Sequence, residues 1–388
     1  MFRLLPRLIA GLAVIVLLCC VAIDAYAQQK PQSLTDHAQT SSATDVLFFD
    51  DVGNLLPKHF NEQTQKAIGR GMAYLASTQH PDGSWRGNTD GATFPVTIAS
   101  LSGMAMLAGG NTTSRGPYAS NVKKAVRFVL SQADPNTGII ARKGGQNEAG
   151  WIMYPHGFAM LFLSSAYGME SDEAVREKMR TVIEKGIRLI SSSQSAQGGW
   201  WYTPDPRRDE GSITVTQLQA LRAAHNAGFV VPEDTIKKAI HYLELCRTPE
   251  GGIRYAFNSG NTTRLPISAA ALPCMYSTGD YESEMAEKCL GYVFKSFCLN
   301  GNNDRWNKGQ GHSFYAHYYA AQAFYQAGDE YWDTYFPAAR DQLLKMQGDE
   351  GQWKGPDGAW QEVGPVYRTA LALTILQLPY KYLPIYQR

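Results

Sequence analysis

Apolar residues recur at helical spacing along most of the chain after residue 58, in two kinds of stretch. In the first kind, apolar and charged residues lie on opposite sides, as in AIHYLEL from Ala239, which predicts an amphipathic surface helix. In the second kind, small and apolar residues occur nearly all round, as in ITVTQLQALRAAHNAG from Ile213, which predicts a buried helix. The two kinds alternate, so the pattern predicts a series of helical hairpins.

A short motif follows each amphipathic stretch and consists of Gln, a turn, Gly and an aromatic or apolar residue. Its clearest copies are GMAYLASTQHPDGSW from Gly71, GIRLISSSQSAQGGW from Gly186 and DQLLKMQGDEGQW from Asp341. The motif recurs every 50 to 62 residues, at Gln79, Gln132, Gln194, Cys246, Phe297 and Gln347. Such a period indicates a repeat of paired helices. We expect the Gln side chain to bond backbone groups left open at the end of its own outer helix, and the aromatic residue to pack on the neighbouring repeat.

The second kind of stretch supplies six predicted inner helices, and five of them end at a Gly that fits a left-handed C-cap. They are Thr93–Gly110, Met153–Gly168, Ser212–Gly228, Arg264–Gly279, His312–Gly328 and Gly364–Leu378. The last of these, with TALALTILQL, is apolar to its end and needs cover from the first repeat. We therefore predict an all-α fold, an (α/α)6 toroid of six helical hairpins.

The first residues form a targeting segment. Arg3 and Arg7 precede an apolar run over 8–23, and Ala25-Tyr26-Ala27 has the small–x–small pattern that a signal peptidase reads. The predicted organisation is a signal peptide over 1–27, a flexible polar tether over 28–57 and the toroid over 58–388. We expect an exported protein, periplasmic or extracellular; the alternative is an uncleaved N-terminal membrane anchor.

Composition narrows the function. Lys and Arg total 36 and Asp and Glu total 35 in 388 residues, so the formal net charge is +1 and argues against a nucleic-acid partner. Four cysteines follow the signal peptide, at 246, 274, 289 and 298, without a CxxC pair. We favour buried free thiols and keep one disulfide as the alternative. The sequence leaves the oligomeric state open.

The Gln-turn-Gly-Trp units resemble the QW-type motifs of the prenyltransferase and squalene oxidase repeat family, which includes squalene–hopene cyclases and protein prenyltransferase β-subunits. The segments HGFAMLFLSSAYG, FYAHYYAAQAFYQAGDEYW and LPYKYLPIYQR are similar to those of exported bacterial members. The resemblance covers about residues 60–388. It implies a toroid with a central cavity whose mouth lies at the N-terminal ends of the inner helices.

The catalytic motifs of that family are incomplete here. Aligning the DxDD acid motif of the cyclases places Glu210, Gly211, Ser212 and Ile213 on its four positions, so Asp209 or Glu210 would have to replace the central acid. His317 aligns with the zinc-binding His of the protein prenyltransferases, but the stretch over 264–268 has neither the Asp nor the Cys ligand. We therefore predict no metal and no cofactor.

Polar and aromatic residues near the cavity mouth are the candidate site. The catalytic candidates are Asp209, Glu210, His156 and His317. The ligand-binding candidates are Asp90, Tyr154, Trp201, Tyr202, Arg264, His312, Tyr315, Tyr319, Tyr367 and Arg368. The alternative is structural: the two acids favour a helix dipole, the histidines are core residues and the tyrosines are packing.

Three function classes follow. The first is a toroid that binds an elongated apolar ligand, such as an isoprenoid, with terpenoid-cyclase-like or transferase chemistry and contact with a membrane surface. The second is a non-catalytic binding or scaffold toroid. The third is a polysaccharide-active enzyme that uses two rim carboxylates, for which the candidates are Asp90, Glu148, Asp209, Glu210 and Glu362.

Overall fold

The structure, a computed structural model, describes residues 56–85, 94–142, 148, 150–299, 312–355 and 363–387. Within these ranges it has twelve α-helices, and β-pairing is limited to isolated bridges. The predicted signal peptide, and all but the last two residues of the predicted tether, lie outside the described ranges. No helix of the described residues combines the length and apolar character that a membrane span requires.

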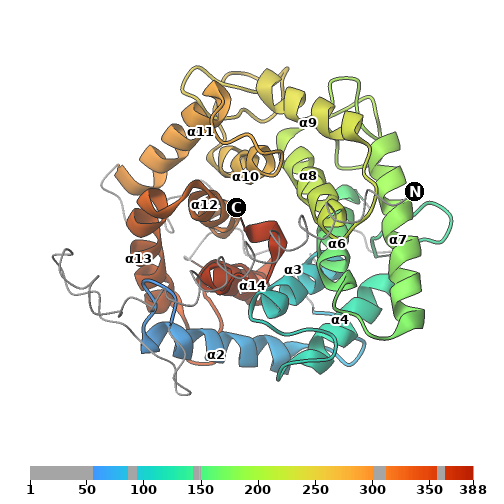
Figure 1. The fold of residues 1–388 in the computed structure, drawn as a ribbon, viewed down its shortest axis with the longest axis vertical. Coiled ribbons are helices and arrows are strands. Elements are labelled where there is room, and N and C mark those ends of the chain that lie inside the picture. The colour runs from blue at the N-terminus through green and yellow to red at the C-terminus, as the bar shows by residue number, and fades with distance from the viewer. Residues whose placement is uncertain are drawn as a thin grey trace, which may run out of the picture. The chain divides into compact units, whose positions relative to one another are not determined.

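Six inner helices lie within a ring of six outer helices (Figure 1). The inner helices are α3 (Pro95–Ala108), α6 (Met153–Tyr167), α8 (Gly211–Asn226), α10 (Leu265–Tyr276), α12 (Ser313–Ala327) and α14 (Gly364–Gln377). The outer helices are α2 (Glu62–Thr78), α4 (Ala119–Ser131), α7 (Glu173–Ser192), α9 (Glu233–Leu245), α11 (Glu284–Phe294) and α13 (Asp329–Met346). Consecutive inner helices pack on one another and α14 packs on α3, so the ring is closed. The predicted all-α (α/α)6 toroid is confirmed.

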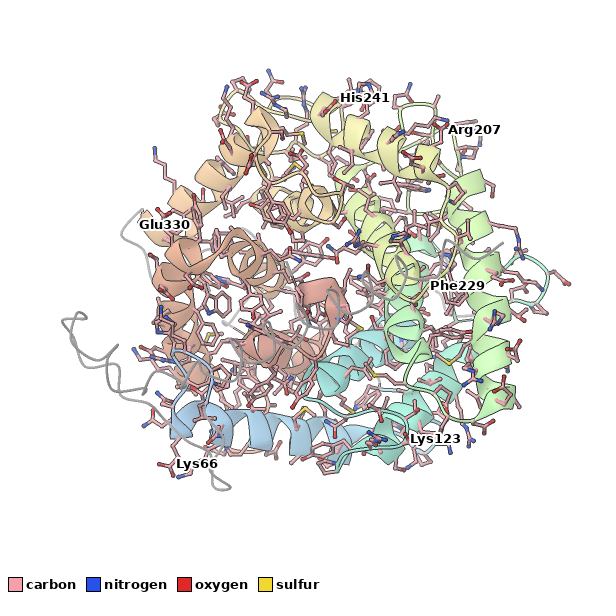
Figure 2. All side chains as sticks on the ribbon, in the orientation of Figure 1. Lys66, Lys123, Arg207, Phe229, His241 and Glu330 are labelled. Carbon is pink, nitrogen blue, oxygen red and sulfur yellow. The ribbon has the colours of Figure 1, made fainter. Side chains whose placement is uncertain are left out.

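Residue patterning explains the two rings. Every residue of α3 is buried, as expected for a helix that is apolar on all sides. The outer helices bury one face and carry their charges on the other, where Figure 2 shows Lys66, His241 and Glu330 on the outside of the ring. The low share of charged residues in the chain is therefore explained by the inner helices, which water does not reach.

In the three copies of the motif that end in Trp, this residue bonds the preceding outer helix. The indole N–H of Trp200 donates a hydrogen bond to the carbonyl of Ile190 in α7, ten residues earlier, at 2.7 Å. Trp85 and Trp353 make the same bond to Leu75 and Leu343, at 2.7 and 2.8 Å. All three Trp side chains are fully buried. The Trp of the motif is therefore a structural residue.

In the three copies that end in Trp, the Gln of the motif joins neighbouring outer helices. Gln194 Nε2 donates to the carbonyl of Gly198 in its own turn (2.8 Å) and to that of Thr235 in α9 (2.9 Å). Gln79 bonds Gly83 and Asn121 in the same way, and Gln347 bonds Gly351 and Ala67. We expected this side chain to bond its own helix; instead its second bond reaches the next outer helix, because the turn brings that helix within reach.

Glycines end most inner helices as predicted. Gly110, Gly228, Gly279 and Gly328 have positive φ angles between 82° and 121°. Gly168 has φ −70°, so the prediction of a left-handed cap is wrong there, since the chain continues in a right-handed turn. No disulfide joins the four cysteines at 246, 274, 289 and 298.

Candidate functional site

The N-terminal ends of the inner helices gather at one end of the toroid, because the chain alternates between an outer and an inner helix and all inner helices therefore run in the same direction. We call this end the rim. Backbone bonds tie its loops together: Met153 N–H donates to the carbonyl of Tyr202, and Gly211 N–H donates to that of Tyr255. The side chains near Tyr202 and Tyr255 thus come from successive repeats.

Glu210 lies at the rim as the N-cap of α8 and is fully buried. Its carboxylate accepts hydrogen bonds from the backbone N–H groups of Ser212 (2.8 Å) and Ile213 (2.5 Å) and from the Ser212 hydroxyl (2.7 Å). These bonds satisfy open donors of the helix and favour the charged carboxylate. Burial has the larger effect and raises the pKa of Glu210 to about 7. The group therefore titrates near neutral pH.

Tyrosine hydroxyls surround this acid. Tyr154 Oη lies 2.5 Å from Ser212 Oγ, and Tyr202 Oη lies 2.7 Å from Tyr255 Oη. Burial and the negative charge of Glu210 raise the pKa of Tyr154 and of Tyr202 above the usual range. Burial and the neighbouring Tyr367 and Glu210 do the same for Tyr315. All three hydroxyls therefore keep their protons at neutral pH. We call Tyr154, Tyr202, Glu210, Ser212, Tyr255 and Tyr315 the rim site.

An aromatic strip continues from the rim site toward α3. The Trp151 ring stacks between Phe94, at 6.2 Å between ring centroids, and Tyr202, at 5.5 Å. Trp151 is 48% exposed, which is unusual for so large an apolar side chain. Next to it, Trp201 packs edge-on against Tyr202 and carries the guanidinium of Arg208 over its face at 3.8 Å. The strip therefore offers flat apolar faces beside hydroxyl groups.

The other three catalytic candidates have hydrogen-bond partners outside the rim site. His156 Nδ1 accepts a hydrogen bond from the backbone N–H of Ile140 (3.2 Å), and its ring is fully buried beneath α7. Burial lowers its pKa to about 4. His317 Nδ1 lies 3.0 Å from the Tyr335 hydroxyl of α13. Both histidines thus lie between the two rings, because their helix positions face outward.

Asp209 also faces outward. Its Oδ2 accepts a hydrogen bond from the Ser195 hydroxyl at 2.7 Å, within the turn that holds Trp200. Its Cβ lies close to Gly199, which also contacts the ring of Tyr242 in α9. The structure therefore does not bring His156 and His317 together with Glu210. Asp209 lies beside Glu210, and its charge helps to raise the pKa of Glu210, but its own hydrogen bond goes to Ser195.

The remaining predicted ligand-binding residues divide between the rim and other places. Tyr315 and Tyr367 are half-buried at the rim, whereas Tyr319 lies one turn deeper and is 1% exposed. Arg264 and His312 are exposed at the starts of α10 and α12. Arg368 Nε donates to the carbonyl of Trp353 (3.3 Å) and so supports the last turn. Asp90 and Glu362 lie outside the described residues.

A second buried carboxylate, that of Glu148, caps the start of α3. Glu148 accepts hydrogen bonds from the backbone N–H groups of Val96 (3.1 Å) and Arg142 (2.8 Å) and is 1% exposed. Burial raises its pKa. Since α6 packs on both α3 and α8, Glu148 and Glu210 cap the helices on either side of α6. Among the described residues, no three His, Cys, Asp or Glu side chains are grouped as a metal ion would need.

Side chains fill the ring centre below the rim. Thr216 and Tyr319 are 1% exposed and Gln322 is fully buried. The described side chains at this depth of the ring centre are therefore closely packed. The partly exposed aromatic surface lies above it, at the rim. A separate groove of about 1030 Å³ lies between α7 and the loop after α8 that contains Phe229 (Figure 2), at the end of α8 opposite to the rim.

Sequence reasoning missed Trp151, Ser212 and Tyr255 as members of the site. A signal for Tyr255 existed, since GGWWY over 198–202 and GGIRY over 251–255 are equivalent in the repeat and end in Tyr202 and Tyr255. Ser212 stands on a position of the acid motif, but its hydroxyl was not taken as a site group. Trp151 carries no such signal.

Comparison with known proteins supports the fold. No family model and no curated protein sequence matches this chain. Among solved structures, a type II terpene cyclase from Scytonema in complex with merosterolic acid A has a TM-score of 0.56 and 14% identity, over 82% of this chain and 97% of that chain. An alpha-1,6-mannanase from Salegentibacter in complex with alpha-1,6-mannotriose has a TM-score of 0.60 and 13% identity, over 82% and 99%. A glycosidase in complex with glucose has a TM-score of 0.58 and 12% identity, over 83% and 98%.

At these identities the likeness shows the toroid fold alone, and that fold is shared by a terpene cyclase and by glycosidases. An enzymatic or a binding role is compatible with it. The choice among functions therefore rests on the rim site itself.

Proposed function

We propose that this protein binds an elongated, largely apolar ligand of the isoprenoid class across its rim, with the polar end of the ligand near Glu210. The observation that carries this proposal is the convergence of half-exposed tyrosines from several repeats around one buried acid, continued by the Trp151 strip. Flat aromatic faces suit an unsaturated chain, and the protonated hydroxyls suit a hydroxyl or phosphate head group.

Proton transfer is the chemistry that the rim site adds. An acid with a pKa of about 7 is partly protonated at neutral pH, so Glu210 can donate or accept a proton. The tyrosine faces would stabilise positive charge that develops on a ligand, because the ring faces carry negative potential. Ligand binding requires neither proton transfer nor stabilisation of positive charge. Binding is therefore the main function that we propose, and proton transfer is an addition to it.

Tryptophan fluorescence tests the proposal, since Trp151 is exposed at the strip. Geranylgeraniol added to the purified protein should change the emission, and Trp151→Ala should weaken binding about 3- to 10-fold, as expected for one lost aromatic contact. His241→Ala, on the outer wall, is the matched control and should bind like the wild type. Absence of any response to the alcohol would leave a scaffold as the better description.

A polysaccharide-active enzyme is the second candidate, favoured by the two carboxylates Glu148 and Glu210 on either side of α6 and by the exposed Trp151 between Phe94 and Tyr202. Release of reducing ends from α-linked mannan tests it. Glu148→Gln and Glu210→Gln should each abolish that release; release that survives both substitutions removes this candidate.

We also propose that the protein acts outside the cytoplasm, where lipids from a membrane are accessible, on the basis of the predicted signal peptide. N-terminal sequencing of the protein isolated from its native host checks this, with Gln28 as the expected first residue.

A further inference from the structure

The chain beyond α14 turns into the ring instead of leaving it. Residues 378–387, which we call the closing segment, form two short 3-10 turns, Leu378–Tyr380 and Pro384–Tyr386. Figure 1 shows this red segment in the middle of the ring of inner helices. The second turn packs on α8 and α12, and Ile385 and Tyr386 are 5% and 3% exposed. Residues of the closing segment therefore occupy the ring centre.

A column of tyrosines joins this segment to the rim site. Tyr386 Oη lies 3.1 Å from Tyr318 Oη in the second turn of α12. The Tyr318 ring packs on Tyr319 at 4.8 Å, and Tyr319 packs on Tyr315 of the rim site at 4.8 Å. Two rings thus separate the inserted Tyr386 from the surface that we assign to the ligand.

The hydrogen bonds from Gln326 to the closing segment are long. Gln326 Nε2 donates to the carbonyls of Ile385 and Gln387 at 3.4 and 3.3 Å, longer than the 2.8 and 2.9 Å bonds of Gln194 in its turn. The Oε1 atoms of Gln326 and Gln322 are buried and have no hydrogen-bond partner. A buried polar atom left in this way is unfavourable, so the filled centre retains hydrogen-bonding capacity that its present occupant does not use.

We propose that residues 383–387 are a displaceable plug, which restricts short ligands to the rim and leaves the ring centre when the apolar end of a longer ligand enters. This inference rests on the proposed function. The entering chain would replace the side chains of Ile385 and Tyr386 among the same apolar neighbours, and a polar group on it, or water, would reach the unused Oε1 atoms of Gln322 and Gln326. The cost of moving the plug lowers the apparent affinity for long ligands only.

Two alcohols of different length test this in the wild-type protein. Geraniol is short enough for the rim, whereas geranylgeraniol has twice the chain length. Hydrogen exchange measured by mass spectrometry should show faster exchange in peptides covering 380–388 when geranylgeraniol binds, and no change when geraniol binds. Protection or no change with bound geranylgeraniol would overturn the plug.

A variant supplies the second measurement. The double substitution Ile385→Ala with Tyr386→Ala should lower the Kd for geranylgeraniol by about tenfold and leave the Kd for geraniol unchanged. Tyr386→Phe, which keeps the ring and loses only the bond to Tyr318, should stay near the wild type. Equal effects on both alcohols would overturn the plug while the proposed function stands. If neither alcohol binds to the wild type or to the variant, the proposed function fails and the plug fails with it.

Discussion

The side-chain amide of Gln347 donates a hydrogen bond to the backbone carbonyl of Ala67, 2.8 Å away, and so joins the last repeat to the first. The bond is equivalent to that of Gln194 with Thr235 inside the ring. Because the two joints have the same geometry, Gln347→Ala and Gln194→Ala should lower the free energy of unfolding by similar amounts, about 1–2 kcal/mol each. Urea denaturation followed by circular dichroism measures both values.

Gln132→Ala is the matched control for this prediction. The amide of Gln132 occupies the same place in its repeat, but among the described residues it donates only to the exposed Ser131 hydroxyl, at 2.8 Å. Its loss should cost less than about 0.5 kcal/mol. A Gln347→Ala variant as stable as Gln132→Ala would mean that the ring is held shut by helix packing without help from this bond.

Glu210 should make stability fall as the pH rises. Its pKa is about 7 in the folded protein against 4.5 for an ordinary Glu, so between these values the folded state binds more protons than the unfolded state. This contribution is fully present below pH 4.5 and is lost by about pH 7, and its size is about 3 kcal/mol. Glu210→Gln should remove it. The free energies of unfolding of variant and wild type, compared from pH 4 to 8, give the difference directly.

His156 should act in the opposite direction. Burial lowers its pKa from 6.5 to about 4, so between these values the unfolded state binds the additional proton. Its contribution is present above pH 6.5 and is lost as the pH falls to 4, again by about 3 kcal/mol. Between pH 4.5 and 6.5 the contributions of His156 and Glu210 to the free energy of unfolding change in opposite directions. Their sum should therefore vary little with pH in this interval.

The substitution His156→Asn separates the contribution of His156 from that of Glu210. The variant should be less stable than the wild type at pH 8, because the backbone N–H of Ile140 loses its acceptor, and the gap should narrow toward pH 4. Binding of geranylgeraniol should be unaffected, since the imidazole lies beneath α7 and away from the rim site. If a folded His156→Asn variant lost most of its ligand binding, His156 would have to be part of the binding site.

The repeat pattern predicted the rings because helix type depends on local composition, as α3 and α7 illustrate: one is buried all round and the other along one face. Direction of side chains was harder to predict. His156 and His317 occupy inner helices, yet the rotation of each helix turns their rings toward α7 and α13, and that rotation depends on packing between repeats.

The closing segment shows the same limit. LPYKYLPIYQR has no helical period that would place it, and only the contacts of Tyr386 and Gln326 reveal that it fills the ring centre. In contrast, Glu210 was found from sequence because it aligns with the acid motif that precedes a predicted inner helix, and the structure shows it as the N-cap of α8. Local chemistry was thus predictable, whereas occupation of the centre depended on long-range packing.

Ser212 should control the acidity of Glu210. Its hydroxyl lies 2.7 Å from both carboxylate oxygens and 2.5 Å from Tyr154 Oη, and its bonds lower the pKa of Glu210 against the effect of burial. In Ser212→Ala the two backbone N–H bonds remain, so the pKa of Glu210 should rise from about 7 by less than one unit, the equivalent of a hydrogen bond of about 1 kcal/mol. The carboxyl stretching band, titrated by infrared spectroscopy and assigned by its loss in Glu210→Gln, measures this pKa.

Ser195→Ala is the matched control, because Ser195 bonds the neighbouring acid Asp209 (2.7 Å) and makes no hydrogen bond to Glu210 in the described structure. Its titration should coincide with that of the wild type. The pH at which ligand binding changes should move with the infrared pKa in Ser212→Ala and stay fixed in Ser195→Ala, since only the first substitution alters the acid at the rim. If the pH dependence of ligand binding stays the same in Ser212→Ala although the pKa of Glu210 has moved, the ligand does not respond to the protonation of Glu210. The acid would then be only the N-cap of α8.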